Sequence, residues 1–368
     1  SIESGRIFVT GIQALARIPM VQRQRDVLEG LNTAGFISGY RGSPVGGFDQ
    51  QLWRAKKFLE QNHIRFQPGL NEDLAASAIW GSQQTNLHEG GKYDGVFAIW
   101  YGKGPGVDRC GDVFKHGNMS GPAKHGGVLL IAGDDHAAKS STVPHQSEYA
   151  FMDASIPVLN PAGLQDIVDY GILGFAMSRF SGCWVAFKTT AENMDSSASI
   201  DVSPDRVKIS LPKFDMPEGG LSIRWPDDWI EQEHRLHQYK LNAVRAFARQ
   251  NKIDKTIINS QNPKLGVVTT GKSYLDVRQA LEDLGIDEAK ADKIGLRLYK
   301  VGMPWPLEPQ GIDEFSQGLK EILVIEEKRP IIESQLKEHL YNHSPENRPK
   351  VVGKYDDKGQ FLQPAAGE

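Results

Sequence analysis

The sequence predicts an α/β protein with mostly parallel sheets, divided into two domains. Short apolar runs rich in Val, Ile and Phe alternate with helical patterns along the chain, which is typical of repeated strand–helix–strand units. Glycine-rich loops follow several of these runs. The 368 residues are enough for about two to three ordinary domains, so a single oversized core is not required.

The first domain is expected to span residues 1–212. Its strands are predicted at residues 36–40, 64–67, 95–100, 128–132 and 183–187. Its helices are predicted at residues 49–61, 71–84 and 164–178. Asn71 is a good N-cap for the second of these helices, because its side chain can accept a hydrogen bond from the first turn.

The second domain is expected to span residues 213–350, beginning with a Pro- and Gly-rich linking arm at 213–226. A long helix is predicted at 229–251. Strands are then predicted at 265–270, 296–301 and 322–326, with helices at 273–284, 312–319 and 332–340. The polar stretch 351–368 has the composition of a linker.

Composition and charge exclude several classes of protein. The net charge of −4 does not provide the basic surface of a general nucleic-acid binder. No apolar run reaches the roughly 18–20 residues that span a bilayer, so we expect a soluble protein with no membrane partner. Two cysteines and the absence of a secretory pattern indicate the cytoplasm. The chain begins without Met and ends in a linker-like stretch, which predicts that it is part of a longer protein.

The ends of parallel strands are where an open α/β sheet binds ligands, and the first such end carries Gly39-Tyr40-Arg41-Gly42-Ser43-Pro44. Glycines here allow the backbone to approach an anion, and Arg41 can bind a carboxylate through two hydrogen bonds. A tight turn with a solvated arginine is the alternative interpretation of the same residues.

The second strand end leads into Glu72, in the first turn of a predicted helix of small residues. A glutamate at this position most often complements the helix dipole. In a dry cleft, however, its pKa would rise and it could take part in proton transfer.

The third strand end contains Lys103 in a Gly-Lys-Gly-Pro-Gly loop, followed by Arg109, Lys115 and His116. The loop lacks the Gly-Lys-Ser/Thr ending of a phosphate-binding loop, and the Rossmann spacing is absent too. The cations and the histidine are instead candidates to bind a carboxylate substrate.

The fourth strand end contains Asp134, Asp135 and His136, with His145 and Glu148 close behind. Neighbouring residues on one loop rarely converge on a single ion, so we predict no metal site here. A hydrogen-bonded loop near a substrate is the favoured interpretation.

Taken together, these segments resemble the indolepyruvate ferredoxin oxidoreductases, in particular the large type with fused subunits. The resemblance covers most of the chain. Its strongest piece is residues 132–141, 146–150 and 156–161, which are similar to the family's Ala-Asp-Asp-Pro, Ser-Ser, Gln, Tyr-Tyr-Ala and Pro-Val-Leu elements. Residues 39–44 are similar to its Tyr-Pro-Gly-Thr-Pro loop, and Lys115-His116 to its Lys-His pair. In the second domain, residues 266–274 and 324–330 match its Gly-x-x-x-x-Gly…Tyr and Val-x-Glu-Glu…Pro elements.

This resemblance implies a fold and a set of residue roles. The fold would be the pyrimidine-binding domain of a thiamine diphosphate enzyme, a mostly parallel sheet with helices on both faces, followed by a smaller α/β domain like the C-terminal domain of transketolase. Glu72 aligns with the catalytic glutamate that hydrogen-bonds the aminopyrimidine ring. Gly42 and Ser43 would help to bind the cofactor. The substrate side would comprise Tyr40, Arg41, Ser43, Arg109, Lys115 and His116.

The implied reaction is oxidative decarboxylation of an arylpyruvate to an acyl-CoA, with electrons passed to ferredoxin. Mg²⁺ and [4Fe-4S] clusters are expected only in the remainder of the enzyme, because the sequence contains neither a Gly-Asp-Gly…Asn segment nor cluster-binding cysteines. The chain would then be an N-terminal portion that is inactive alone. It would meet a diphosphate-binding domain of the same or another chain, in a homodimer.

Three alternatives remain open at this point. One is a non-oxidative thiamine lyase, which would release CO₂ and an aldehyde without reducing viologen. The same chemistry could act on branched-chain or small 2-oxo acids, because one chain does not show the assembled pocket. The chain could also be an inert pyrimidine-domain-like module that serves as a partner or scaffold.

Overall fold

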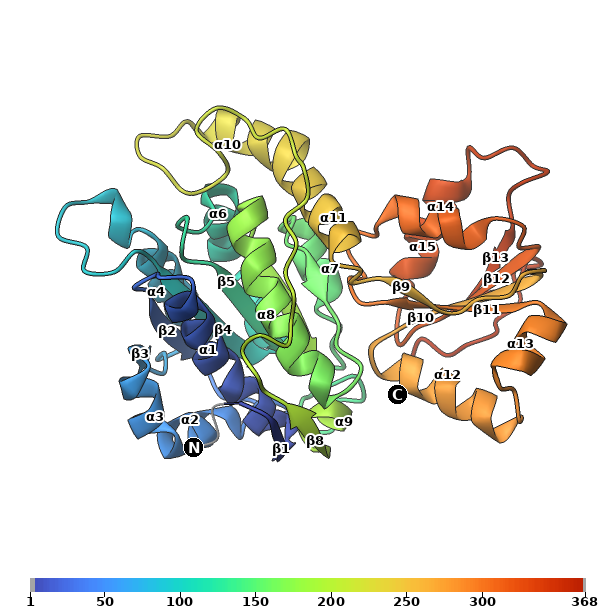
Figure 1. Ribbon diagram of the computed structural model, residues 1–368, viewed down its shortest axis with the longest axis horizontal. Helices are drawn as coiled ribbons and strands as arrows, with labels where there is room; N and C mark the ends of the chain where they lie inside the picture. The colour runs from blue at the N-terminus through green and yellow to red at the C-terminus, as the bar shows by residue number, and fades with distance from the viewer. Residues whose placement is uncertain (1–3, 367–368) are drawn as a thin grey trace.

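The computed structural model describes residues 4–366, which form two α/β units lying side by side (Figure 1). The first unit, coloured blue to yellow, holds a six-stranded sheet, and the second, coloured orange to red, holds a five-stranded sheet. The predicted α/β class with mostly parallel sheets is confirmed. Among the described residues, no helix combines the length and the apolar character that a bilayer span requires.

The sheet of the first unit is parallel throughout, with strand order β3-β2-β4-β5-β7-β6. Its central strands are mostly apolar and almost entirely buried, as expected for a sheet covered on both faces. The strands are β2 (Ala34–Gly39), β3 (Ile64–Phe66), β4 (Val96–Lys103), β5 (Val128–Gly133), β6 (Val158–Leu159) and β7 (Val185–Thr189).

Helices cover both faces of this sheet, and alternate strand residues enter two separate apolar cores. One core lies under α1 (Gly11–Leu28), α2 (Phe48–Arg54), α3 (Lys56–Gln61), α8 (Leu164–Ser181) and α11 (Leu241–Gln250). The other lies under α4 (Glu72–Gln83), α5 (Gly104–Arg109), α6 (Gly111–Ser120) and α7 (Glu148–Asp153). The unit is completed by an antiparallel pair, β1 (Arg6–Thr10) and β8 (Ser197–Asp201), by a 3₁₀ turn at Thr85–Leu87, and by α9 (Ala191–Met194).

The long helix between the two sheets packs against the first of them. The helix expected at 229–251 forms α10 (Trp229–Arg235), a π-helical turn (Leu236–Lys240) and α11. Leu236, Val244 and Phe247 bury their side chains in the core of the first unit rather than the second. The linking arm and this helix therefore belong with the first unit, and the second begins near Asp254.

The second unit has strand order β13-β12-β10-β11-β9, with β9 antiparallel at one edge. Its strands are β9 (Lys255–Ile258), β10 (Leu265–Thr270), β11 (Leu296–Val301), β12 (Glu321–Ile325) and β13 (Lys350–Val352). One face packs against α12 (Gly271–Asp283) and α13 (Glu288–Ile294), and the other against α14 (Pro309–Ser316) and α15 (Ile332–Leu340).

The stretch expected to be a linker, 351–368, folds back onto the second unit over its described part. Its first residues complete β13, which pairs in parallel with β12. Gln363 Nε2 donates to the Val324 carbonyl at 2.9 Å, and Lys354 Nζ donates to the Glu326 carbonyl. These bonds satisfy backbone groups at the edge of β12 that would otherwise face water. Residues 367–368 lie outside the described part.

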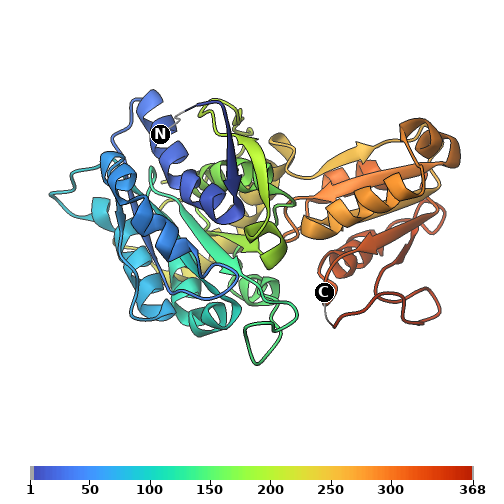
Figure 2. The ribbon, with the colours of Figure 1, turned by 90° about the horizontal axis from the view of Figure 1, so that it is seen from below.

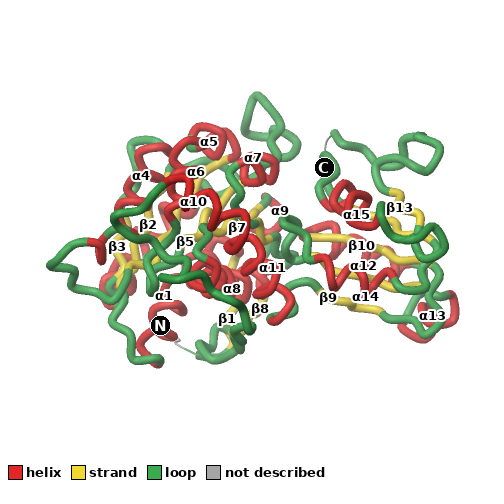
Figure 3. Tube along the Cα trace, turned by 90° about the horizontal axis from the view of Figure 1, so that it is seen from above, coloured by secondary structure: helices red, strands yellow, loops and turns green. Residues whose placement is uncertain are grey.

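The two units are joined by backbone pairing as well as by the chain. Val158 N–H donates to the Trp305 carbonyl at 2.7 Å, and Asn160 N–H donates to the Gly302 carbonyl at 2.9 Å. Lys300 Nζ lies 2.5 Å from Asp166 Oδ2 across the same junction. Figures 2 and 3 show the second unit extending away from the first, with the C-terminus on the side that faces the first unit.

Candidate functional site

The strand ends of the first unit that carry the predicted site residues lie level at one edge of the sheet. Gly39 of β2 is in register with Tyr101 of β4, and Gly133 of β5 with Lys103 of β4. We call this the strand-end edge. It is the edge at which open parallel sheets bind their ligands.

The loop after β2, residues 40–47, lies across the ends of the next two strands. A Cβ atom on Gly42 would come within 2.9 Å of Lys103 Cβ, and a Cβ atom on Gly133 within 2.9 Å of Pro44 Cδ. Glycine at both places therefore lets the loop approach β4 and β5 closely. Above this contact Tyr40, Arg41 and Ser43 are exposed, with 41% of Tyr40 accessible.

Glu72 is the first residue of α4, which follows β3 at the same edge of the sheet. Asn71 caps the helix by accepting a hydrogen bond from Leu74 N–H at 2.8 Å, and Trp100 Nε1 donates to the Glu72 carbonyl at 3.0 Å. A Cβ atom on Gly106 would lie 2.9 Å from Glu72 Oε1, so only glycine lets α5 pack this closely against the carboxylate. The Glu72 carboxylate is half-buried and makes no hydrogen bond or ion pair with any described residue.

Asp135 organises the loop that follows β5. Its carboxylate accepts hydrogen bonds from the backbone N–H groups of Lys139 and Ser140, at 2.9 and 2.8 Å, and forms an ion pair with Lys103 at 3.3 Å. Burial opposes ionisation, but these donors outweigh it and lower the pKa of Asp135. The loop is thereby fixed to the end of β4.

His145 connects this loop to α5. Its Nε2 lies 2.8 Å from Asp108 Oδ2, and its Nδ1 lies 3.5 Å from Asp134 Oδ1. Burial lowers the pKa of His145, but the two carboxylates on either side outweigh it and raise the pKa overall. The two carboxylates therefore favour the protonated, positively charged form of the imidazole.

A lysine and two carboxylates are buried together beneath the loop. Lys188 Nζ, on β7, lies 2.5 Å from Glu148 Oε1 and 3.6 Å from Asp134 Oδ2. Burial disfavours each charge alone, yet the mutual attraction raises the pKa of Lys188, and His145, Lys188 and His136 together lower the pKa of Asp134. The three residues Lys188, Glu148 and Asp134, called here the buried trio, link α7 and the loop after β5 to strand β7.

The loop also contacts the second unit through polar groups. Glu327 Oε2 lies 3.3 Å from His136 Nδ1, and Lys328 Nζ donates to the His136 carbonyl at 2.7 Å. Tyr149 Oη donates to the Pro330 carbonyl at 2.6 Å, and the guanidinium of Arg329 lies 3.9 Å from the centre of the Tyr149 ring. The strand-end edge of the first unit is thus held against the segment after β12.

The predicted site residues fall into two groups. The loop residues Tyr40, Arg41, Gly42 and Ser43 follow β2, and Glu72 follows β3, at the same strand-end edge. The side chain of Arg109, exposed at the end of α5, makes no hydrogen bond or ion pair among residues 4–366. Lys115 and His116 lie further along α6 and have other contacts. Lys115 Nζ lies 2.6 Å from Asp153 Oδ2, and the His116 ring stacks on Trp80.

The sequence analysis did not single out Lys188 or Glu327. A signal for Lys188 was present, because a lysine interrupts the apolar run Val-Ala-Phe-Lys-Thr of β7 and a buried strand rarely carries an unpaired charge. Glu327 lies in the Val-x-Glu-Glu…Pro element at 324–330, but the resemblance assigned it no role and the mixed charge around it gave no further signal.

Comparison with known proteins gives related sequences and folds. Residues 254–368 match the family described as the indolepyruvate ferredoxin oxidoreductase middle domain. The indolepyruvate oxidoreductase subunit IorA of Pyrococcus abyssi is 27% identical over 346 residues, and that of Methanothermobacter thermautotrophicus is 25% identical over 340 residues. These matches cover 90% and 91% of this chain, but only 47% and 48% of the relatives, so the chain spans about half their length.

A solved structure shares the fold over nearly the whole chain. It is a 2-oxoglutarate:ferredoxin oxidoreductase from Magnetococcus marinus with 2-oxoglutarate, coenzyme A and succinyl-CoA bound. The TM-score is 0.65 at 15% sequence identity, over 95% of this chain and 62% of that chain. The start of the middle-domain match at residue 254 coincides with the boundary that the buried cores place between the two units.

Proposed function

We propose that this chain is the N-terminal portion of an indolepyruvate ferredoxin oxidoreductase, supported by the middle-domain match and by the similarity to the IorA subunits, and that its strand-end edge forms the pyrimidine side of a thiamine diphosphate site. The complete enzyme would decarboxylate an arylpyruvate oxidatively, form an acyl-CoA and pass electrons to ferredoxin. When bound, the cofactor supplies a carbon nucleophile and an electron sink. The residues of this chain would orient the cofactor and the substrate and supply the charges around them.

The observation that carries the proposal is the Glu72 carboxylate, half-buried at the strand-end edge without a partner among the described residues. Its backbone is fixed by Trp100 and by the Asn71 cap, and Gly106 leaves room for the carboxylate beside α5. A carboxylate held in this way can exchange a proton with a ring nitrogen placed against Oε1 or Oε2. The Glu72 carboxylate therefore fits the ring nitrogen of an aminopyrimidine.

The exposed loop after β2 supplies the substrate side of the proposed site. Arg41 can bind the carboxylate of a 2-oxo acid through two hydrogen bonds, with Tyr40 and Ser43 beside it, and Gly42 and Ser43 would help to hold the cofactor. Arg109 is free to join them. Lys115 and His116 keep this role only through their sequence resemblance, because their contacts in the structure are with Asp153 and Trp80.

The proposed enzyme needs groups that this chain does not supply. In this proposal a second domain of the same or another chain would bind Mg²⁺ and the diphosphate, and the [4Fe-4S] clusters would lie elsewhere in the complete enzyme. The strand-end edge of each chain would face such a domain in a homodimer. Coenzyme A and ferredoxin would act on the assembled enzyme.

The test is a comparison of Glu72→Gln and Asp73→Asn in the complete enzyme. We measure anaerobic reduction of methyl viologen with thiamine diphosphate, Mg²⁺ and coenzyme A. Loss of the proton-exchanging carboxylate should slow turnover about 10²–10⁴-fold, while Asp73→Asn, in the same helical turn, should leave turnover close to wild type. Near-wild-type turnover of Glu72→Gln would remove Glu72 from the mechanism.

The substrate is settled by the same assay with indolepyruvate, phenylpyruvate, 2-oxoisovalerate and pyruvate. Faster reduction with the two aryl substrates supports the arylpyruvate proposal. A preference for 2-oxoisovalerate or pyruvate would support the same chemistry on other 2-oxo acids. No reduction with any of them, in an enzyme with intact clusters, would favour an inert module over a catalytic domain.

A further inference from the structure

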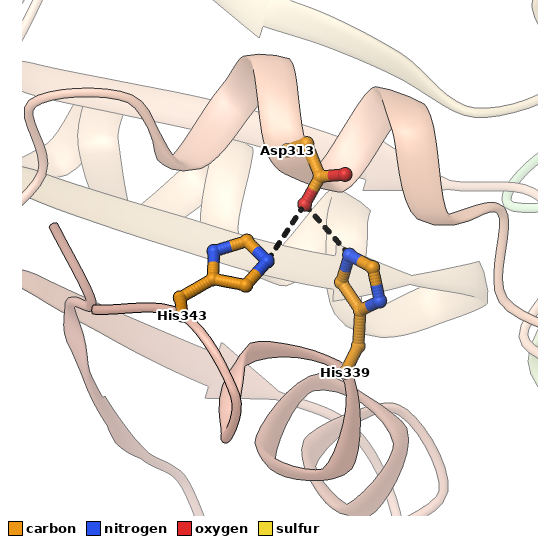
Figure 4. A group of neighbouring side chains, drawn as sticks. All are labelled: Asp313, His339 and His343. Carbon is orange, nitrogen blue, oxygen red and sulfur yellow. Dashed lines mark hydrogen bonds and ion pairs between the residues drawn. The ribbon is translucent and has the colours of Figure 1, made fainter. Parts of the chain in front are cut away.

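Two histidines and an aspartate converge on the second unit, away from the strand-end edge. Figure 4 shows Asp313 on α14 and His339 on α15, with His343 one turn beyond the end of α15. His339 Nε2 lies 2.6 Å from Asp313 Oδ1, and His343 Nε2 lies 3.5 Å from the same oxygen. The three side chains are 29–42% exposed, so one side of the cluster is open to water.

Helix packing fixes the positions of these three residues. On α14, Ile312 enters the apolar core of the second unit, and on α15, Leu336 and Leu340 enter the same core. Asp313 and His339 are next to buried residues in the chain, so they lie at the rim where the two helices meet. The His343 N–H donates to the Leu340 carbonyl at 3.0 Å, which continues the helical turn and keeps His343 beside His339.

The spacing suits a small cation with short bonds. The candidate ligand atoms all lie within 4.8 Å of one another. A tetrahedral ion with bonds of about 2.0–2.2 Å holds its ligand atoms roughly 3.3 Å apart. The two contacts to Asp313 Oδ1, at 2.6 and 3.5 Å, lie on either side of that value, so a small side-chain rotation would admit the ion.

We propose that Asp313, His339 and His343 bind a divalent transition-metal ion of the Zn²⁺ class and so bridge α14 and α15. Two imidazole nitrogens and one carboxylate oxygen favour Zn²⁺, Co²⁺ or Ni²⁺ over Mg²⁺ and Ca²⁺, which take oxygen ligands. Water completes the coordination on the exposed side. The ion is bound by the folded chain and not by the unfolded one, so it stabilises the packing of the two helices.

The test is a titration of the metal-free full chain with Co²⁺, followed by visible absorption, and then competition with Zn²⁺. We expect one Co²⁺ per chain with nitrogen and oxygen ligands, displaced by Zn²⁺, and a rise of a few degrees in the thermal midpoint on addition of Zn²⁺. His339→Gln and His343→Gln should each weaken binding at least tenfold. Asp313→Asn should weaken it too, while its amide oxygen can still accept a hydrogen bond from His339.

The matched control is the double variant His234→Gln/His237→Gln, which removes two exposed histidines three residues apart on another helix. It should leave the affinity unchanged. The proposal fails if the control loses Co²⁺, if the chain takes up no Co²⁺, or if His343→Gln binds as tightly as wild type. Far-UV circular dichroism is used to check that each variant is folded. Because the side chains are partly exposed, we expect all of them to fold.

Discussion

Two glutamates of the first unit occupy the same position in a helix and have opposite surroundings. Glu72 begins α4 and Glu148 begins α7. Glu148 is 5% exposed and its Oε1 lies 2.5 Å from Lys188 Nζ, whereas the carboxylate of Glu72 has no partner among the described residues. The same local pattern therefore serves two purposes. A paired carboxylate stabilises the fold, and an unpaired one is available to a ligand.

The sharpest test of this contrast is Lys188→Met. It removes the cation from the buried trio and leaves the Glu148 carboxylate without its counter-charge and Asp134 with only the two histidines. We therefore expect the free energy of unfolding to fall by about 3–5 kcal/mol. Urea denaturation measures the loss. The control is Lys240→Met, because Lys240 is also buried but donates only to the backbone carbonyls of Asn118 and Met119. An equal loss in both variants would show that the carboxylates do not matter.

The carboxylate of Asp254 is buried where the two units join. Its Oδ1 accepts hydrogen bonds from the N–H groups of Gly302 and Met303, at 2.7 and 2.9 Å, while its Oδ2 is buried without a partner. Burial raises the pKa of Asp254 to about 7. Between about pH 4 and 7 the folded state therefore keeps a proton that the unfolded state has lost, and the free energy of unfolding falls as the pH rises.

Asp254→Asn should remove this part of the pH dependence. The variant should be more stable than wild type at pH 8, by roughly 2 kcal/mol, and the difference should shrink toward pH 4. Urea denaturation at several pH values measures both effects. Asp195→Asn, at an exposed position, should leave the profile unchanged. Parallel profiles for wild type and Asp254→Asn would contradict the argument.

The contact between the units gives a smaller effect. Tyr149→Phe removes the hydrogen bond from Oη to the Pro330 carbonyl and keeps the ring against Arg329. We expect a loss of about 1 kcal/mol, typical of one hydrogen bond, together with faster amide exchange in α7. Tyr355→Phe, at an exposed tyrosine, is the control. Unchanged exchange in α7 would mean that this bond does not hold the junction.

The regular elements of the fold follow from local pattern, because each has an apolar run with clear ends. The structure has β10, β11 and α15 at the residues predicted, 265–270, 296–301 and 332–340. Helix α1 was not predicted, because buried polar residues interrupt its apolar pattern. Asp26, on its inner face, forms an ion pair at 2.6 Å with Arg179, which lies 153 residues away.

The sequence predicted at which edge of the sheet the candidate site residues lie, but not which side chains pair with one another. Parallel strands carry their ends to one edge, so residues 40–43 and Glu72 were expected at that edge, and only the family resemblance assigned them to one site. The pairing of Glu148 with Lys188 depends on the three-dimensional approach of α7 to β7, which no spacing in one sequence reveals. For the same reason the sequence did not distinguish the partnered Glu148 from the unpartnered Glu72.

The smallest expected effect on stability belongs to Glu72→Gln, the variant proposed above to have the largest effect on turnover. The Glu72 carboxylate makes no hydrogen bond or ion pair with residues 4–366, and the Asn71 cap and the Trp100 hydrogen bond use backbone atoms of the helix. Replacing the carboxylate with the glutamine amide should therefore change the free energy of unfolding by less than about 0.5 kcal/mol. Glu148→Gln, in the matching position of α7, should cost several times more, since Lys188 would lose its nearest counter-charge. Urea denaturation of the two variants side by side measures this difference. If Glu72→Gln proves as destabilising as Glu148→Gln, then Glu72 is a structural residue, and the slower turnover of that variant would no longer support its role in proton exchange.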